Sequence, residues 1–291
     1  MALALLLCTS FALGEAGDEA KDTATAENKA KQLREGILAE AAALTDHPWA
    51  GEYRSGDGIL TRQSLLLAPE AGYLFEWGGC MGLYYRNYGP VKESNGRIRL
   101  SFTLKNKGEL GASKGIPEEF VPVVWGDQHY LIPAGDLLGF CNTVNEGLAP
   151  EVRGAFYLVR NSDWKKPTAG LPLVPEQFQP YLLATPVTAE ITDINAVTTR
   201  PTRGGWQYKD TRVTLNAGRK TGLLKGMRMY VVEPEDRYGL FLINTVEESS
   251  SQAVMSVHER QDGKVKHPPE KGWQLSTRRV WPKSATQQLP E

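Results

Sequence analysis

Apolar positions change their spacing along the chain, and each change predicts a different type of element. In residues 26–45 the apolar side chains recur every three or four positions, which is the spacing of an amphipathic helix. They are Leu33, Ile37, Leu38, Ala41 and Leu44. Thr25 is suited to cap the start of this helix, and Pro48 predicts its end. We therefore expect one helix, packed by its apolar stripe on the domain that follows.

From residue 46 to residue 165 the apolar runs are short, rich in aromatic and β-branched residues, and separated mostly by Gly, Pro, Asn or Asp. Turn signals recur about every 8–12 residues, which is typical of an antiparallel sandwich or barrel. Asn95-Gly96 is a strong hairpin signal directly before one run. No helical pattern alternates with the runs, so an antiparallel β domain is expected over 46–165. The expected strands are 51–55, 62–69, 72–77, 82–89, 97–104, 119–126, 128–134 and 154–160.

Residues 166–186 are rich in proline, which removes a backbone donor and excludes a central strand or a long helix. We expect a linker there that packs on a surface through Phe178 and Tyr181. Six further strand-like runs in 187–280 suit a small β-barrel, and the tail 281–291 is polar. The predicted fold is therefore mainly β: an N-terminal helix followed by two small antiparallel β domains, a sandwich or barrel and then a six-stranded barrel.

Residues 1–16 resemble a secretory signal peptide, with an apolar run and a cleavage site near Gly14 or Ala16. Residues 17–25 are small and polar and predict a tether. Cys8 leaves a lipid anchor as a second interpretation, although the residue before it is larger than such a motif requires. No later run reaches about 18 apolar residues, so we expect no transmembrane span. The predicted location is periplasmic or secreted, in a bacterium.

The charge of the chain bears on its possible partners, and its cysteine content bears on a possible disulfide. The chain has 33 basic and 34 acidic residues and a formal net charge of -1, whereas nucleic-acid binders usually carry a basic excess. We therefore expect no nucleic-acid partner.

Once a signal peptide is removed, Cys80 and Cys141 remain, both in apolar, glycine-flanked surroundings. In an exported chain they predict one disulfide, with two separate buried thiols as the alternative.

The segment VTLNAGRKTGLLKGMRMYVV, residues 213–232, places a glycine-rich turn between two apolar runs. A phosphate loop needs an earlier glycine and a following helix, and both are missing here. An architectural role is favoured. Asn216 and Gly218 are expected where a turn needs a positive φ, and Gly222 and Gly226 are expected to bracket a tight turn before the next strand.

With the LINTVEESSSQAVMSV segment that follows, this pattern is similar to the C-terminal barrel of the flagellar assembly protein T family. It is also similar to barrels of the rod-shape-determining protein C family. The resemblance covers roughly residues 187–258. It implies an exported, non-catalytic scaffold or assembly module with a protein partner in the cell envelope.

The first β domain supports a second hypothesis, a small-ligand-binding protein. Its opening WAGEY is similar to the start of lipocalin-like and avidin-like barrels, whose interiors hold one small ligand. Aromatic side chains that suit a ligand surface occur in this domain, although core packing explains most of them equally well. The candidate ligand-binding residues are Trp77, Tyr84, Tyr85 and Trp125.

Catalytic patterns are weak, so we expect no enzyme, no metal and no cofactor. Ser113 lies in a G-x-S-x-G sequence, but its flanks indicate a solvated loop and not a strand-to-helix elbow. Glu52 and Asp57 are a poor match to a glycosidase carboxylate pair. His129 lies in a strand-like run, where a hydrogen bond to a neighbour is more usual than catalysis. An unrecognised hydrolase is the third hypothesis, and it requires either a histidine within hydrogen-bond reach of Ser113 or a carboxylate pair in a cleft.

Overall fold

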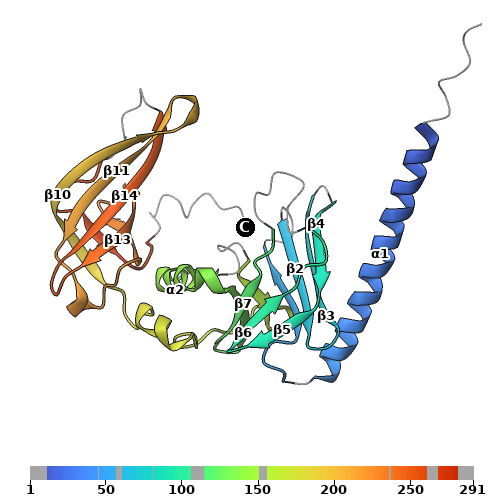
Figure 1. Ribbon diagram of the computed structural model, residues 1–291. Coiled ribbons are helices and arrows are strands. Elements are labelled where there is room, and N and C mark those ends of the chain that lie inside the picture. The colour runs from blue at the N-terminus through green and yellow to red at the C-terminus, as the bar shows by residue number, and fades with distance from the viewer. Residues whose placement is uncertain are drawn as a thin grey trace, which may run out of the picture. The chain divides into compact units, whose positions relative to one another are not determined.

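The computed structural model describes residues 12–44, 46–56, 61–80, 82–105, 115–150, 156–235, 237–260 and 268–280, with side chains from residue 27 onward. The chain folds as two compact units (Figure 1). The first, which we call the sheet unit, comprises residues 1–122, 128–134 and 158–166. The second, the barrel unit, comprises residues 123–127, 135–157 and 167–291. The predicted mainly β fold is confirmed.

The sheet unit contains one helix and a nine-stranded sheet, except that residues 123–125 at the end of β7 are counted in the barrel unit. The sheet has the order β4-β3-β2-β1-β9-β8-β7-β6-β5. The helix is α1 (Ala12–Ala43), and the strands are β1 (Gly51–Ser55), β2 (Thr61–Ala68), β3 (Gly72–Gly79), β4 (Gly82–Gly89), β5 (Val91–Ser94), β6 (Arg97–Leu100), β7 (Glu119–Trp125), β8 (Gln128–Pro133) and β9 (Leu158–Arg160). The predicted hairpin at Asn95-Gly96 is confirmed: it joins β5 to β6, and both residues have the positive φ of its tight turn.

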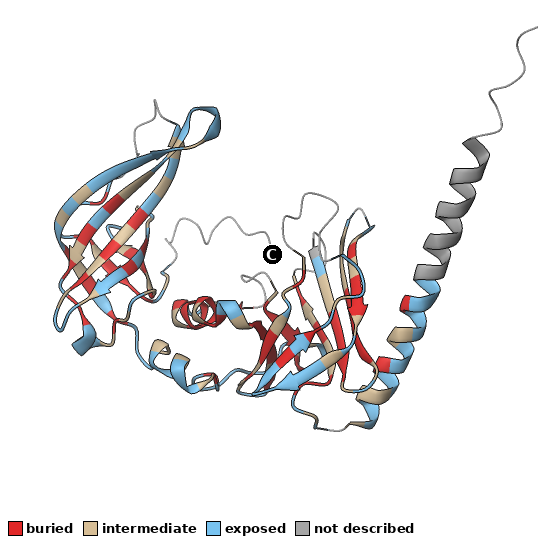
Figure 2. Ribbon diagram, in the orientation of Figure 1, coloured by how far each residue is buried: buried red, intermediate tan, exposed pale blue. Residues whose placement is uncertain are grey.

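The two faces of the sheet differ because successive residues of a strand point to opposite sides. The row Tyr53, Leu65, Phe75 and Asn87, aligned across β1 to β4, is fully buried on the inner face. The neighbouring row Arg54, Ser64, Glu76 and Arg86 therefore lies on the outer face. In Figure 2 the buried residues of β2 and β3 form continuous red runs, because one half of each strand is covered on both faces.

Helix α1 packs on the outer face of the sheet. Ile37 is fully buried there against the aligned residues Leu66, Leu74 and Tyr88. Burying an isoleucine side chain contributes about 1.5–3 kcal/mol, so this contact anchors the helix. Glu40 strengthens the anchor, because its carboxylate accepts hydrogen bonds from two backbone N–H groups in the β2–β3 turn, at 2.9 and 2.7 Å.

The start of α1 corrects the prediction of a helix over 26–45. The helix begins at Ala12, so residues 17–25 are helical and not a tether. This segment has no apolar stripe, and only Glu19, Ala20, Lys21 and Ala24 have high intrinsic helix propensity, so its sequence gave little local signal for a helix. Residues 1–11, including Cys8, lie outside the described part of the chain.

A second helix, α2 (Leu137–Glu146), follows the one-turn helix η1 (Ala134–Asp136) and belongs to the barrel unit. It lies inside the segment 46–165, for which only strands were expected. Gly147 ends it in a left-handed conformation and donates its N–H to carbonyls of the last turn. Most of α2 is buried, so its apolar positions do not form the single stripe that identifies a surface helix.

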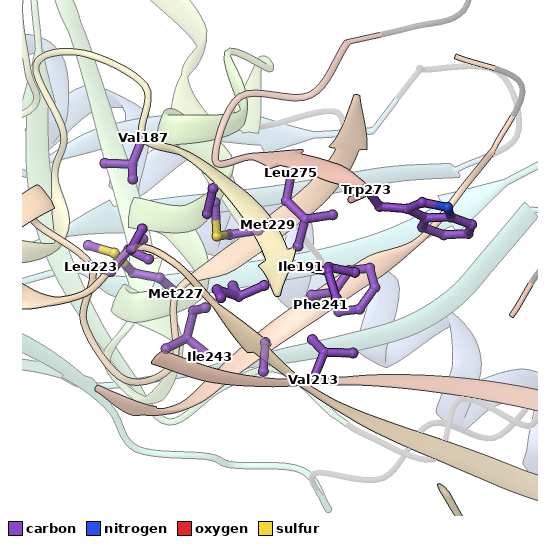
Figure 3. Close-up of a cluster of buried hydrophobic side chains, with 14 of the residues drawn as sticks. Val187, Ile191, Val213, Leu223, Met227, Met229, Phe241, Ile243, Trp273 and Leu275 are labelled. Carbon is purple, nitrogen blue, oxygen red and sulfur yellow. The ribbon is translucent and has the colours of Figure 1, made fainter. Parts of the chain in front are cut away.

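Six strands form a closed barrel in the order β10-β11-β14-β13-β12-β15, as predicted for residues 187–280. They are β10 (Thr188–Pro201), β11 (Trp206–Leu215), β12 (Arg228–Glu233), β13 (Leu240–Val246), β14 (Ser251–Arg260) and β15 (Gln274–Ser276). Strands β10, β11 and β14 are the longest, and together they continue past the ends of β12, β13 and β15 (Figure 1). Alternate residues point inward, among them Ile191, Val213, Met229, Phe241 and Leu275, and fill the barrel (Figure 3).

The glycine-rich turn at 216–226 has the architectural role expected of it, with one correction. Gly222 and Gly226 have φ of 90° and 88°, whereas Asn216 and Gly218 do not have a positive φ. Gly218 is needed for another reason: a Cβ there would lie 2.5 Å from the Glu247 carbonyl oxygen. Asn216 closes the barrel end by accepting a hydrogen bond from the Glu190 N–H at 2.8 Å.

The proline-rich segment 166–186 contains one short 3₁₀-helix, η3 (Glu176–Tyr181), and a single bridge between Leu173 and Val124. Tyr181 packs against the barrel core, as the sequence predicted. The Phe178 carbonyl faces the Cys141 sulfur at 3.9 Å.

Candidate functional site

The barrel has a step at one edge, because strand β14 extends beyond the first residue of its neighbour β13. Phe241 of β13 pairs with Met255 of β14, and β13 starts at Leu240. Strand β14 continues to Arg260. Residues 257–259 therefore pair with β11 on one side and have no residue of β13 opposite them on the other.

The backbone groups of β14 are directed into this step. Gly239 accepts a hydrogen bond from Val231 N at 3.2 Å, and Ile243 N donates to Met227 O at 2.9 Å, so both residues face β12. Because such groups alternate along a strand, those of Leu240 and Leu242 face β14. Leu242 pairs with Val254, so the backbone groups of Val254 face β13. His258 lies four residues later on the same strand, so its N–H and C=O groups face the same side, which is the open side of the step.

A cavity of about 570 Å³ occupies the same place. Its wall combines the β14 edge with residues of the segment before β13 and the end of the described chain. Tyr238, Leu240 and Val280 are apolar lining residues that remain largely exposed, Tyr238 at 62 %. Arg237 and Arg279 add positive charge, against the single carboxylate of Glu235.

Next to the cavity, exposed aromatic rings form a ladder on the outer face of β11 and β14. Tyr208 and His258 are directly paired, and their rings stack with 4.6 Å between centroids. Trp206 also stacks with His258, with 5.0 Å between ring centroids, and Arg200 lies over the Tyr208 ring at 5.4 Å. Trp and Tyr rings that are held rigidly and exposed are the side chains most enriched at protein interfaces.

We call this combination the barrel step: the edge of β14 past the start of β13, the cavity beside it and the aromatic ladder. It offers backbone donors and acceptors in strand spacing, an apolar wall and cationic side chains. These are the features by which a sheet edge receives an additional strand. The sequence pattern does not reveal it, because the step depends on how far two strands extend past each other.

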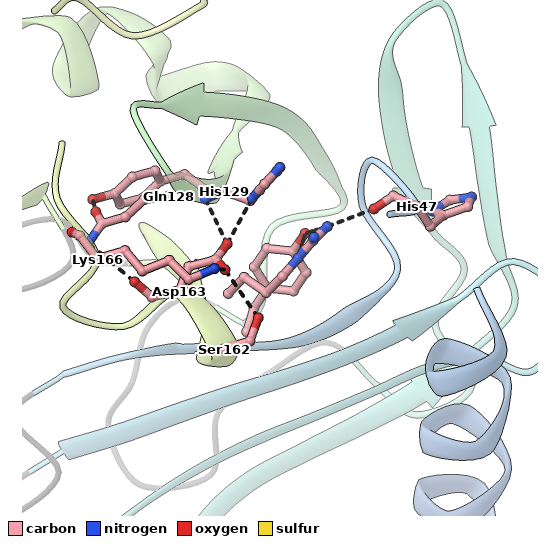
Figure 4. Close-up of polar contacts among 9 residues, drawn as sticks. His47, Gln128, His129, Ser162, Asp163 and Lys166 are labelled. Atoms are coloured by element: carbon pink, nitrogen blue, oxygen red, sulfur yellow. Dashed lines mark hydrogen bonds and ion pairs between the residues drawn. The ribbon is translucent and has the colours of Figure 1, made fainter. Parts of the chain in front are cut away.

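His129, the histidine considered for acid–base chemistry, has a structural environment (Figure 4). Its N–H and its Nδ1 contact the buried carboxylate of Asp163 at 3.1 and 2.8 Å. Lys166 Nζ donates to the same carboxylate at 2.7 Å. Burial acts to raise the pKa of Asp163, but the hydrogen bonds from Lys166 and His129 outweigh it and hold that pKa below its usual value.

A serine also belongs to this cluster, but the order of contacts is not that of a nucleophile and its base. Ser162 Oγ donates to Asp163 at 3.2 Å, whereas a serine nucleophile must contact the histidine. Ser113 and Asp57, the other residues considered for hydrolysis, lie outside the described residues. Glu52 accepts a hydrogen bond from Asn161 Nδ2 at 3.0 Å.

The four aromatic residues predicted to bind a ligand do not come together as one group. Trp77, Tyr84 and Tyr85 lie on β3 and β4, where the Trp77 and Tyr84 rings meet edge to face at 5.9 Å. Tyr85 is buried and accepts a hydrogen bond from Asn87 at 2.6 Å. Trp125 belongs to the barrel unit and donates its indole N–H to Gly170 O at 2.9 Å.

The inner face of the sheet is filled by large side chains, which counts against a lipocalin-like ligand interior. They are fully buried and include Tyr53, Leu65, Leu67, Tyr73 and Phe75. The small-ligand hypothesis requires an open interior at this face.

The expected disulfide between Cys80 and Cys141 is wrong. Both are free thiols. Cys141 is buried on α2, where burial raises the pKa of its thiol to about 12. Cys80 is exposed at the β3–β4 turn of the other unit, so similar apolar flanks in the sequence did not indicate proximity.

No group of three or more metal-ligating side chains occurs among the residues that the structure describes. Within the same residues, no helix has the length and apolar character needed to cross a membrane. No family model matches the chain, and no curated protein or solved structure matches it.

Proposed function

We propose that the protein is a non-enzymatic interaction module of the bacterial cell envelope, whose barrel binds an extended segment of a protein partner at the barrel step. The observation that carries this proposal is the edge of β14 over residues 257–259, which extends past the start of β13 beside a cavity of about 570 Å³.

The physical argument is that an added strand satisfies groups that the barrel leaves open. A sheet edge presents N–H and C=O groups that pair readily with another extended chain. Main-chain hydrogen bonds then supply affinity, and pockets for alternate side chains supply specificity. At the step, Tyr238, Leu240 and Val280 form an apolar wall where such side chains would enter.

The location in the envelope is supported by the sequence. The resemblance of residues 187–258 to envelope barrel modules and the signal-like N-terminus both favour an exported protein. The first test is mass spectrometry of the mature N-terminus recovered from cell fractions. A start near residue 15–17 in the periplasm supports export, and an intact N-terminus in the cytoplasm contradicts it.

Binding is tested with a displayed library of random heptapeptides selected on the full chain. Peptides that bind the step are expected to require the backbone N–H of His258 and not its side chain. His258→Pro removes that N–H, and proline is tolerated at a sheet edge, whereas His258→Ala keeps the N–H. We expect selected peptides to bind His258→Ala within a few-fold of the wild type and to lose binding to His258→Pro.

Hydrogen exchange of the complex provides an independent test of peptide binding. The amide of His258 is expected to become protected when a selected peptide binds. Equal binding to both variants, or a selection that enriches no peptide, would overturn the proposal. Retained circular dichroism and melting temperature of His258→Pro show that the loss is not unfolding.

A further inference from the structure

The outer face of the sheet unit carries a charged cavity of about 730 Å³ beside helix α1. We call it the arginine cavity. Its polar lining residues come from α1 and from strands β1 to β4, with Asn161 beside β1. They are Arg34, Glu52, Arg54, Arg62, Ser64, Glu76, Arg86 and Asn161.

Strand register gathers these residues. Arg54, Ser64, Glu76 and Arg86 are aligned partners across four neighbouring strands, and so they form one row. The row before it carries Leu66, Leu74 and Tyr88 and is covered by α1. The charged row therefore begins where the apolar contact of the helix ends.

The cavity has more positive than negative charge. Arg34 and Arg86 share the carboxylate of Glu76, with Arg86 Nη2 at 2.7 Å from it. The lining contains four arginines and two glutamates, which leaves an excess of two positive charges. Arg62 has no ion pair within the described residues, and the Arg54 guanidinium lies 3.9 Å above the Trp164 ring.

Two polar atoms of the row are buried and lack a hydrogen-bond partner in the described structure. They are Ser64 Oγ and Arg54 Nε. A buried donor without a partner is unfavourable, so both atoms are suited to an acceptor that enters the cavity.

The end of the cavity toward the β3–β4 turn is lined by glycines and by the exposed side chain of Leu83. Gly78, Gly79 and Gly82 line it, and a Cβ on Gly78 would lie 2.9 Å from the Gly82 carbonyl oxygen. The hairpin therefore needs glycine at position 78, and the space above it stays open to a ligand.

We propose that the arginine cavity binds a small organic dianion, one that carries a phosphate group or two carboxylates. The excess of two positive charges matches such a ligand, and guanidinium groups bind carboxylate and phosphate oxygens through paired N–H donors. Its volume is within the range of small-molecule sites. This site lies in the sheet unit and takes a small molecule, so it is independent of the peptide-binding function proposed for the barrel.

Two probes test the proposal by isothermal titration calorimetry on the full chain: phenyl phosphate for the phosphate class and succinate for the dicarboxylate class. Saturable binding of one probe to one site supports the proposal and identifies the class. We expect Arg62→Gln to weaken that binding about tenfold, because it removes an exposed guanidinium without breaking an ion pair.

Lys92→Gln is the matched control, because Lys92 is an exposed cation on β5 outside the cavity lining. We expect Lys92→Gln to change the dissociation constant of the probe by less than twofold. Ser64→Ala removes a hydroxyl without changing charge, and it is expected to weaken binding several-fold.

Equal effects of Arg62→Gln and Lys92→Gln would show that only general charge attraction is measured and would overturn the proposal. So would the lack of saturable binding of either probe at millimolar concentration. Circular dichroism and melting temperatures of the three variants, equal to those of the wild type, confirm that the fold is retained.

Discussion

At the scale of single residues, Asp163 shows how one buried carboxylate organises a region of the sheet unit. The carboxylate accepts hydrogen bonds from the His129 N–H and from Lys166, and Asp163 is only 2 % exposed. Its contacts join the start of β8 to the short helix η2 (Asn161–Asp163). His129 therefore has a partner that explains its position without catalysis.

The depressed pKa of Asp163 predicts a pH-dependent contribution to stability. An unfolded aspartate has a pKa of about 3.9, and the native value is lower, so the ionised form stabilises the fold above that pH. This stability is lost as the pH falls through the native pKa. We expect Asp163→Asn to lower the free energy of unfolding by about 1–3 kcal/mol at pH 7, and by less below pH of about 4.

Urea unfolding at several pH values, followed by tryptophan fluorescence, measures this difference. Asp127→Asn is the control, because Asp127 is exposed and lies one residue before β8. A cost for Asp163→Asn that does not change with pH would contradict the linkage.

At the scale of elements, α2 is attached to the barrel by polar contacts. Asn142 donates to Gly226 O at 3.0 Å and accepts from Arg228 N at 3.1 Å, so it bridges the helix to the start of β12. Glu146, one turn later, contacts Arg228 and the Tyr230 hydroxyl. The glycine-rich turn that ends at Gly226 thus also presents a backbone carbonyl to the helix.

Asn142→Ala is expected to destabilise the barrel unit by about 2–3 kcal/mol, because it leaves two backbone groups without their partner at a site where Asn142 is 4 % exposed. Chemical denaturation monitored by circular dichroism gives the value. Asn244→Ala, at an exposed position of β13, is expected to cost less than about 0.5 kcal/mol. Similar costs for the two variants would show that the bridge does not stabilise the unit.

At the scale of the whole molecule, the division into a sheet unit and a barrel unit predicts local responses to mutation. Ile37→Ala removes a fully buried side chain between α1 and the sheet, and such losses cost about 2–5 kcal/mol. We expect faster hydrogen exchange in α1, β2 and β3, and unchanged exchange in β10, β11 and β14.

Leu38→Ala is the matched control for this experiment, because the neighbouring Leu38 is 40 % exposed. It is expected to leave exchange in both units close to that of the wild type. If Ile37→Ala accelerates exchange through the barrel strands as well, the two units unfold together, contrary to the prediction.

Much of the fold could be predicted because its signals are local. The strand runs, the Asn95-Gly96 hairpin and the six strands of the barrel follow from side-chain alternation and turn chemistry. The helix α1 was predicted from its apolar stripe, but only over the part that packs on the sheet. Its earlier turns contain several Gly, Asp and Thr residues of low helix propensity and no apolar stripe, so the sequence did not indicate them.

The sequence by itself determined most of the strand segments, although not β5, and it determined that the barrel interior is apolar. Tertiary structure alone decided what depends on residues distant in the chain. It separated Cys80 from Cys141, placed α2 against Gly226, and aligned Arg54, Ser64, Glu76 and Arg86. It also left residues 257–259 of β14 beyond the start of β13. Register and strand length are set by packing of the whole sheet, and so neither candidate site is encoded in any single stretch of sequence.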